Sequence, residues 1–462
     1  MSALNVARGL VALAVLTGPA QLCAQTTPFA SERSLEERVR DLEQQLQAPK
    51  PAELPKPQEK VKPPILAGWD KGFILRSADD LFQLRITGQV QAEYRYYLDQ
   101  EDTTDLPTFL VRRARLGIEA TVRKYYELRF LPDFGNGQTR IQDAYLNVRY
   151  WDEVQFETGK FKQPFSIEQL IQDRFVPVIE RSLIDQLVPA RDVGLMIHGQ
   201  KLLDDRLDYG VSIYGGVRDG DIDTDRNKEF AGRVAVRPLK GFGIDWAEGL
   251  QLGVAGTIGE DNGVLVQNSY RTPANVPWFQ FANGMRPDGQ RARCSPEFVY
   301  VYGPAMLMSQ YYWQSTELLA PPTATQFARN VDLTAEGFYV MGTLLITGER
   351  RDSFSQTIDP IRPLEPVDGV FGCGAIELVG RVSHLEFDTD DPRAFTRLVN
   401  ASRTARRAME TTLGFNWYLN RYVRFQFNWE YARFSNAVRL GNSPSASLDH
   451  QNSFITRFQI VF

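Results

Sequence analysis

Apolar and polar residues alternate regularly along much of the chain after residue 81. In the segment 84–96, every second residue is apolar and the residues between them are polar. A period of two places the two kinds of side chain on opposite faces of a β-strand. The segment is longer than the roughly 5–6 residues of an ordinary globular strand, and it suits the about 9–11 residues with which a tilted strand crosses a membrane. The apolar positions are Leu84, Ile86, Gly88, Val90, Ala92, Tyr94 and Tyr96.

The same alternation returns in residues 114–122, 126–130, 144–150, 423–431 and 454–462. A soluble β-sandwich also alternates, but its strands are shorter and its turns recur about every 8–12 residues. Aromatic residues gather where the segments of this chain end, as they do at the two faces of a membrane. We therefore expect a β-barrel in an outer membrane. The aromatic positions are Tyr96, Tyr97, Tyr150, Trp151, Trp417 and Tyr418.

Taken in order, these segments predict an all-β fold, a 16-stranded antiparallel transmembrane β-barrel with both termini at the periplasmic end. The connections after strands 2, 4, 6 and 14 are short, as periplasmic turns are, whereas those after strands 1, 3, 5, 9 and 15 are longer. The boundaries between residues 260 and 335 are the least regular. The predicted strands begin near residues 84, 110, 126, 141, 154, 193, 207, 229, 250, 296, 305, 333, 374, 409, 421 and 451.

Three segments precede the barrel, which we expect over residues 70–462. Residues 1–24 combine one basic residue, an apolar run and small residues, which predicts a cleaved secretory signal peptide. Residues 31–48 carry Leu35, Val39, Leu42 and Leu46 at alternating spacings of four and three, the seam of a short coiled-coil helix. So short a helix is marginal alone, so we expect it to join chains that are held together elsewhere. Residues 49–69 are rich in proline and predict an extended linker.

The composition argues against several kinds of site. The chain has 462 residues, a net charge of −5, three cysteines and three histidines, and no Cys/His cluster has metal-ligand spacing. We expect no metal, no cofactor and no nucleic-acid partner. A barrel-embedded hydrolase would need a nucleophile and a base, but the chain lacks a Gly-x-Ser-x-Gly motif and offers few candidate bases. We place Cys294 near the outer rim and Cys373 at the periplasmic end, and expect no disulfide between them.

Several short motifs, in order from about residue 70 to the end, resemble the phosphate-selective porin O/P family of outer membranes. The resemblance implies a homotrimer in contact with outer-membrane lipid, with its N-terminal segment in the periplasm. It also implies that the loop from Gln163 to Asp192 and the periplasmic segment from Arg350 to Cys373 fold into the lumen. The motifs are RRARLG at 112–117, DAYL at 143–146, GKFKQPF at 159–165, ERS at 180–182, RDVG at 191–194, TGE at 347–349, GAIEL at 374–378, GFNWY at 414–418 and RFQ at 457–459.

A pore performs no covalent chemistry, and it selects solutes by its width and by the charges along its wall. The alternation places many arginines on the lumen face, and Arg presents a planar fork that binds phosphate oxygens in pairs. We therefore predict an outer-membrane porin for passive diffusion of small anionic solutes such as phosphate. The predicted substrate-binding residues are Arg113, Arg115, Arg129, Arg149, Lys160, Lys162, Arg174, Arg181, Arg191, Arg381 and Arg457.

Acidic residues on the same faces leave two alternatives open. Arginines that pair with wall carboxylates would stiffen the barrel and leave little net field. The outer loops carry an acidic patch of Asp221, Asp223 and Asp225 and no lysine cluster. A general or mildly cation-preferring porin fits these features, and so does a structural envelope-anchoring protein tied through its N-terminal coil. The acidic lumen residues are Glu93, Glu119, Glu127, Asp133, Asp143, Glu377 and Glu430.

Overall fold

The structure of the protein, a computed structural model, describes residues 34–47, 65–98, 107–265, 267–322, 326–367, 369–440 and 447–462. The chain divides into two compact units, Met1–Lys62 and Pro63–Phe462. The predicted signal peptide and most of the predicted linker lie outside the described residues. In the first unit, helix α1 (Leu35–Gln47) exposes Leu35, Val39 and Leu42 of the predicted seam. The helix is present, and the coiled coil stays a prediction.

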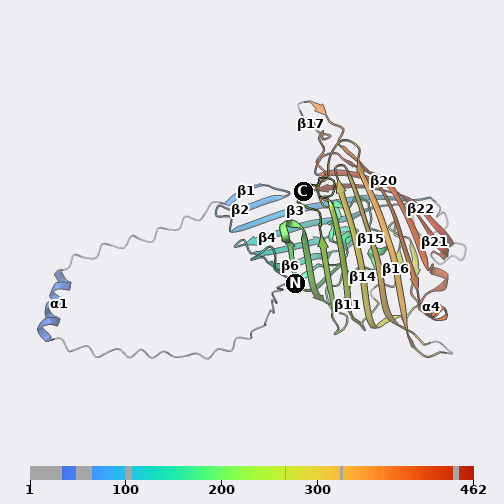
Figure 1. Ribbon diagram of the computed structural model, residues 1–462, viewed down its shortest axis with the longest axis horizontal. Helices are drawn as coiled ribbons and strands as arrows, with labels where there is room; N and C mark the ends of the chain where they lie inside the picture. Colours follow the sequence, from blue (N-terminus) through green and yellow to red (C-terminus); the bar gives the residue numbers. More distant parts are fainter. Residues whose placement is uncertain are drawn as a thin grey trace, which may run out of the picture. The chain divides into compact units, whose positions relative to one another are not determined.

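Sixteen strands of the described part of the second unit close into one antiparallel barrel, whose slanted strands lie side by side in Figure 1. The last strand, β22, pairs with the first, β3, from Ser453 opposite Tyr97 to Val461 opposite Gln89. The strands are β3 (Phe82–Tyr97), β4 (Thr108–Val122), β5 (Tyr126–Asp133), β6 (Arg140–Val148), β7 (Gln155–Lys162), β8 (Arg191–Lys201), β9 (Leu207–Tyr214), β10 (Glu229–Val236), β11 (Leu250–Asp261), β14 (Arg286–Tyr302), β15 (Ala305–Ala320), β16 (Arg329–Leu345), β19 (Ala375–Asp388), β20 (Arg407–Tyr418), β21 (Val423–Arg439) and β22 (Ser447–Val461).

The barrel reverses the usual burial of side chains, because its apolar residues face outward and its polar residues face inward. Along β22, Phe458 and Ile460 are 48% and 43% exposed, whereas Arg457 and Gln459 are 1% and 3% exposed. In water this arrangement would expose a large apolar surface, whereas in a bilayer the outer face contacts hydrocarbon. The alternation in the sequence therefore corresponds to a lipid-facing and a lumen-facing side of each strand.

A hairpin that the sequence analysis missed precedes the barrel. Strands β1 (Ile65–Trp69) and β2 (Phe73–Ser77) pair with each other, and β2 extends the sheet beside the start of β3. The Trp69 ring lies 4.8 Å from the Phe73 ring, and its Nε1 donates a 3.0 Å hydrogen bond to the Tyr422 hydroxyl. The described barrel unit thus begins inside the range assigned to the linker, because the preceding prolines concealed a short apolar strand.

One strand boundary was predicted wrongly. Strand β14 begins at Arg286, about ten residues before the predicted start, whereas the other fifteen starts lie within four residues of their predictions. The first part of β14 is almost wholly polar, and its pairing with β15 shifts register between Pro287 and Arg291. In such a run, apolar and polar residues cannot be seen to alternate, because almost no apolar residue is present. Cys294 therefore lies within the strand rather than at the rim, and it and Cys373 are both exposed free thiols.

The helical elements of the second unit are short and lie in the connections between strands. Across the described ranges, no helix is long and apolar enough to cross a membrane. The helices are α2 (Ile167–Leu170), α3 (Leu202–Asp205) and α4 (Pro392–Leu398), with 3-10 turns η1 (Gly135–Gly137), η2 (Asp173–Phe175), η3 (Leu183–Gln186) and η4 (Ala401–Arg403).

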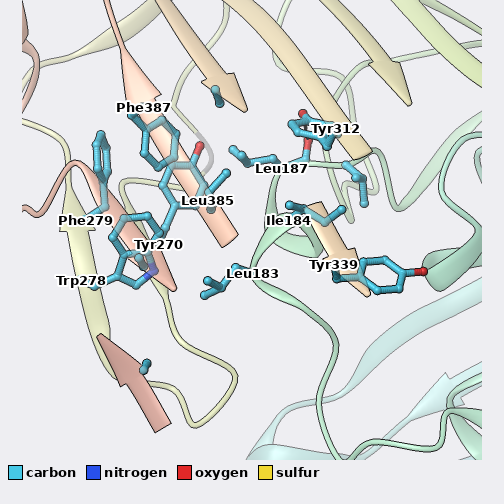
Figure 2. Close-up of a cluster of buried hydrophobic side chains, with 14 of the residues drawn as sticks. Leu183, Ile184, Leu187, Tyr270, Trp278, Phe279, Tyr312, Tyr339, Leu385 and Phe387 are labelled. Carbon is cyan, nitrogen blue, oxygen red and sulfur yellow. Dashed lines mark hydrogen bonds between the residues drawn. The ribbon is translucent and has the colours of Figure 1, made fainter. Parts of the chain in front are cut away.

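The connection between β7 and β8, named here loop 163–190, folds into the barrel as the resemblance implied. Its side chains Leu183, Ile184 and Leu187 are buried. They belong to the same apolar cluster as Tyr312 of β15 and Tyr339 of β16, and Figure 2 draws Leu187 near Tyr312 and Ile184 near Tyr339. The loop is therefore held by apolar packing against the inner wall of the barrel.

Close approach and hydrogen bonds add to this packing. A Cβ built on Gly337 of β16 would lie 2.6 Å from a methyl carbon of Ile184, so only glycine leaves room for the loop here. The Tyr312 hydroxyl donates a 3.1 Å hydrogen bond to the Leu187 carbonyl, and the Leu183 amide donates a 3.0 Å bond to the Ser383 hydroxyl. The position of the loop is thus specified by shape as well as by hydrophobicity.

A second inward segment, residues 262–285, carries strands β12 (Ser269–Arg271) and β13 (Pro277–Gln280). Its buried Trp278 and Phe279 pack against wall aromatics, with the Phe279 and Phe387 rings 4.2 Å apart and Trp278 stacked 6.4 Å from Phe434. Figure 2 shows Trp278, Phe279 and Phe387 close together. The two inward segments cover the inner faces of β14 to β21 at this level and leave a polar space beside β3 to β8.

The segment between β16 and β19 only partly follows the expectation that it folds into the lumen. Arg351 and Ile358 are buried, and Arg351 forms an ion pair with Glu377. The hairpin of β17 (Pro366–Val367) and β18 (Val370–Phe371) instead stands out from the barrel in Figure 1, with Phe371 65% exposed. A part of this segment therefore closes the end of the barrel, and a part extends away from it.

Candidate ion pathway

Two cavities lie in the polar space between β3 to β8 and loop 163–190. One cavity, which Arg129, Lys162 and Arg174 help to line, has a volume of about 340 Å³ and is named here the turn-side cavity. The other, which Arg112 and Glu180 help to line, has a volume of about 470 Å³ and is named here the loop-side cavity. Arg115, Asp173 and Arg191 line both cavities. These three residues therefore lie between the two cavities, where loop 163–190 meets the wall, and this place is named here the constriction.

The wall strands place their arginines beside carboxylates of neighbouring strands. Arg115 of β4 donates from Nε to Asp133 of β5 at 2.7 Å. Asp143 of β6 accepts from Arg129 Nε at 3.0 Å and from Arg191 Nε at 2.7 Å. Each pair joins adjacent or nearly adjacent strands on the lumen face, so the arginines stiffen the wall as well as lining it.

A β-bulge adds an arginine that the sequence analysis missed. In the β3–β4 pairing, Gln91 lies opposite Arg113 and Ala92 lies opposite Val111, so Arg112 is the extra residue. A bulge lets two consecutive side chains turn to one face, and Arg112 reaches Glu180 in the lumen. The signal was present in the sequence, because the outward apolar positions Val111 and Ala114 are three residues apart instead of two.

Asp173 of loop 163–190 lies in a cage of three guanidinium groups. Its carboxylate contacts Arg115 Nη1, lies 2.8 Å from Arg181 Nη1 and lies 3.4 Å from Arg113 Nη2. Burial alone would raise the pKa of this carboxyl, but the charges of Arg113, Arg181 and Arg115 outweigh it and hold the pKa well below its ordinary value. Asp173 therefore stays ionised at the constriction.

Glu180 of the same loop lies in a second cage. Its Oε1 atom is 2.7 Å from Arg112 Nε, 3.1 Å from Arg457 Nη2 and 3.2 Å from Arg95 Nη2. Here too burial would raise the pKa, and Arg112, Arg113 and Arg457 hold the pKa of the carboxyl well below its ordinary value. The loop thus carries two permanent negative charges into the most basic part of the barrel.

Lys162 and Arg174 differ from the other cations of the pathway. Among the described residues, neither forms an ion pair with a carboxylate, whereas the other nine predicted site residues all do. Lys162 Nζ donates to the carbonyls of Leu170 and Ile171 at 3.3 Å and 2.9 Å. The Arg174 guanidinium lies 4.9 Å from the centre of the Phe175 ring. Both cations line the turn-side cavity.

Sequence comparison identifies the group to which these features belong. The profile of the family described as phosphate-selective porin O and P matches residues 84–462. The chain belongs to this family. No curated protein sequence matches the chain.

Solved structures agree with the fold of this porin. The outer-membrane expressed OmpT of Vibrio cholerae is 12% identical, with 84% of this chain and 100% of that chain covered at a TM-score of 0.51. The in-vitro folded OmpT of the same organism is 13% identical, with 84% and 99% covered at a TM-score of 0.50. At these identities the similarity concerns the fold alone. Family and fold together identify an outer-membrane channel in contact with membrane lipid, rather than an enzyme.

The porin brings eight of the eleven predicted site residues together along the two cavities. The other three lie elsewhere. Arg149 is exposed beyond the end of β6, Arg381 is covered by loop 163–190, and Arg457 is 1% exposed behind Glu180. Alternation along a strand shows on which face a residue lies. It does not show how deep in the barrel the residue is, or whether a loop covers it. The residues on the cavities are Arg113, Arg115, Arg129, Lys160, Lys162, Arg174, Arg181 and Arg191.

Basic residues exceed acidic residues along the pathway even though most of them are paired. Ten basic and six acidic residues line the loop-side cavity, and five basic and three acidic residues line the turn-side cavity. Within the described residues, no group of three or more metal-ligating side chains could hold a metal ion. The pathway of this porin is therefore a mixed-charge channel with a positive balance.

Proposed function

We propose that this porin conducts small anions, phosphate among them, in preference to cations. The positive balance of the loop-side cavity carries the proposal, because ten basic residues face six acidic ones there. Charges that line a narrow, low-dielectric path raise the local concentration of ions of opposite sign. The family membership and the name of the family support the same direction.

Lys162 and Arg174 are the groups that we propose meet a passing anion most directly. Neither side chain has a carboxylate partner among the described residues, so an anion can approach them without displacing an ion pair. The paired cations Arg113, Arg115, Arg129, Lys160, Arg181 and Arg191 would shape the field of the path, and their forks would exchange between wall carboxylates and solute oxygens. Arg149, Arg381 and Arg457 would act by holding the wall and the loop.

Zero-current potentials measured in a planar bilayer under a potassium chloride gradient test the proposal. The sign of the potential should correspond to chloride permeating faster than potassium, and added phosphate should reduce the chloride current. A potential of the opposite sign would replace this proposal with a general or cation-preferring porin. A barrel that conducts neither ion would favour the structural, envelope-anchoring role.

A second proposal concerns assembly. We propose that three copies associate through their barrel walls and their N-terminal helices, with those helices in the periplasm. Leu35, Val39 and Leu42 lie along one seam of α1 and are exposed in the single chain, so partner helices would bury them. Light scattering in detergent should give a trimer, and Leu42→Asp should weaken it relative to the matched variant Glu43→Gln. A monomeric wild-type porin would contradict the proposal.

A further inference from the structure

We propose that Asp173 and Glu180 are tethered anions, which occupy two guanidinium cages in the pore and determine how strongly this porin holds a passing oxyanion. The proposal rests on the proposed conduction of anions and adds the residues that set its selectivity. Its ligand class is small oxyanions with paired oxygens, of which inorganic phosphate and sulfate are examples.

The first observation is the geometry of the cages. Asp173 contacts Arg115 and lies 2.8 Å from Arg181 and 3.4 Å from Arg113. A single carboxylate oxygen of Glu180 is shared by three more guanidinium groups at 2.7–3.2 Å, and its other oxygen lies 3.7 Å from Arg113. Carboxylates and phosphates accept hydrogen bonds from an arginine fork in the same way. Each cage therefore has the donor set of an oxyanion site, with a protein carboxylate in place of the ion.

The second observation is where the cages come from. The guanidinium groups belong mostly to the wall strands β3, β4 and β22, whereas both carboxylates belong to loop 163–190. The wall supplies Glu93 to Arg95 and Arg457, and it supplies Asp133 to Arg115. Among the described residues it supplies no carboxylate to Arg112 and Arg113, and repulsion among unpaired guanidinium groups is costly in a partly desolvated lumen. The loop provides this missing negative charge from inside the pore.

The third observation is access. Asp173, Glu180 and the arginines Arg95, Arg112, Arg113, Arg115 and Arg181 all line the loop-side cavity. An ion that enters this cavity therefore reaches the cages without any change of fold. Because the tethered carboxylates already occupy the donors, a passing anion meets only the residual positive charge. Conduction needs binding that is weak enough to release the ion, and the two carboxylates provide that weakening.

Neutralising each carboxylate without changing its shape tests the inference. Asp173→Asn and Glu180→Gln should each open a cage to ions from solution. We expect the chloride-to-potassium permeability ratio to rise about threefold, and the phosphate concentration that halves the chloride current to fall about tenfold, equivalent to about 1.4 kcal/mol. Glu153→Gln is the matched control, because Glu153 is exposed in the turn between β6 and β7 and lines neither cavity.

A second measurement keeps the test independent of conduction. Sulfate should raise the temperature at which the Asp173→Asn barrel loses its folded mobility on an electrophoretic gel, and it should not do so for the wild-type porin. If Glu180→Gln does not fold, the result for Asp173→Asn alone tests the inference. The Asp173 cage has three guanidinium groups, fewer than the Glu180 cage. Folded variants whose permeability ratio, phosphate block and sulfate response all equal those of the wild type would overturn the inference.

The result of this test can be distinguished from the result that tests the proposed function. A wild-type porin that prefers cations would contradict anion conduction, yet the two variants would still be expected to shift the ratio toward chloride. If the wild type prefers anions and the variants shift nothing, the proposed function stands and the tethered carboxylates have no role in selectivity.

Discussion

The inner wall of this porin has two unlike parts. The strands β3 to β8 present arginines and carboxylates to the two cavities, whereas β15, β16 and β19 present Met308, Tyr312, Tyr339 and Leu385, all of them buried. The polar part faces solvent in the lumen, and the apolar part faces loop 163–190 and the segment 262–285. One half of the wall therefore lines the path of the ions, and the other half holds the loop that narrows this path.

The difference shows how a barrel can place a loop precisely inside a water-filled lumen. Apolar packing against β15 and β16 holds one side of loop 163–190, and the cages around Asp173 and Glu180 hold the other side. Salt screens an ion pair to the extent that solvent ions reach it, whereas it does not weaken apolar contacts. The anchor on the apolar half should therefore persist under conditions in which the polar half exchanges partners with ions.

The largest effect is expected from breaking the apolar anchor. Leu183 is fully buried, and Leu183→Asp would place an unpaired carboxylate in an apolar cluster, which costs several kcal/mol. Loop 163–190 should leave the wall while the barrel stays closed, because its strand pairing is unchanged. Single-channel conductance should rise about twofold or more, and the noise of the open current should increase.

Two further variants sharpen this prediction. Gly337→Leu should displace Ile184 from the other side of the contact and give the same rise in conductance. Phe327→Asp, at an exposed position between β15 and β16, should leave the conductance unchanged. Equal conductance in Leu183→Asp and the wild type would mean that the loop is held by its ion pairs alone.

The two halves also differ in how far their sequence predicts them. On β3, β4 and β22, alternation interrupted only by the bulge at Arg112 gave strand starts and lumen faces that the structure confirms. On β14 to β16 the inner positions are apolar too, as at Met306 and Met341, so the contrast between the faces is lost. This region is where the predicted boundaries were least regular. A periodic pattern reports a strand only while one of its faces meets water.

The pathway was predictable in part for a related reason. Parity assigned Arg113 and Arg115 to the lumen, where both line the loop-side cavity, but the bulge at Arg112 and the cover over Arg381 depend on long-range pairing and packing. Asp173 and Glu180 were not among the predicted site residues. Their place in the cages follows from the fold of loop 163–190, which has no periodic pattern to reveal it.

A smaller effect is expected from the unpaired cations of the polar half. Removing the charge of Arg174 should lower the chloride-to-potassium permeability ratio about threefold, because one charge about 6 Å from an ion in water is worth about 0.7 kcal/mol. Arg174→Gln keeps the polarity and length of the side chain to a large extent. The matched control is Arg149→Gln, since Arg149 is exposed beyond the end of β6. The zero-current potential of each variant gives the ratio, and equal shifts in both would mean that the turn-side cavity has no special role.

The smallest effect concerns pH and lies at the border between the two halves. Burial raises the pKa of the Glu168 carboxyl to about 7, and Arg381, 3.6 Å away, offsets a part of this increase. A carboxyl whose pKa is raised on folding stabilises the docked loop fully below its ordinary pKa, and this stabilisation is lost as the pH rises through about 7. Loop 163–190 should therefore be held most firmly at acidic pH, and current fluctuations should become more frequent between pH 6 and pH 8, a window set by the raised pKa. Glu168→Gln, which cannot ionise, should show the same fluctuation rate across this range. A wild-type rate that is constant with pH would mean that the apolar contacts alone determine how tightly the loop is docked.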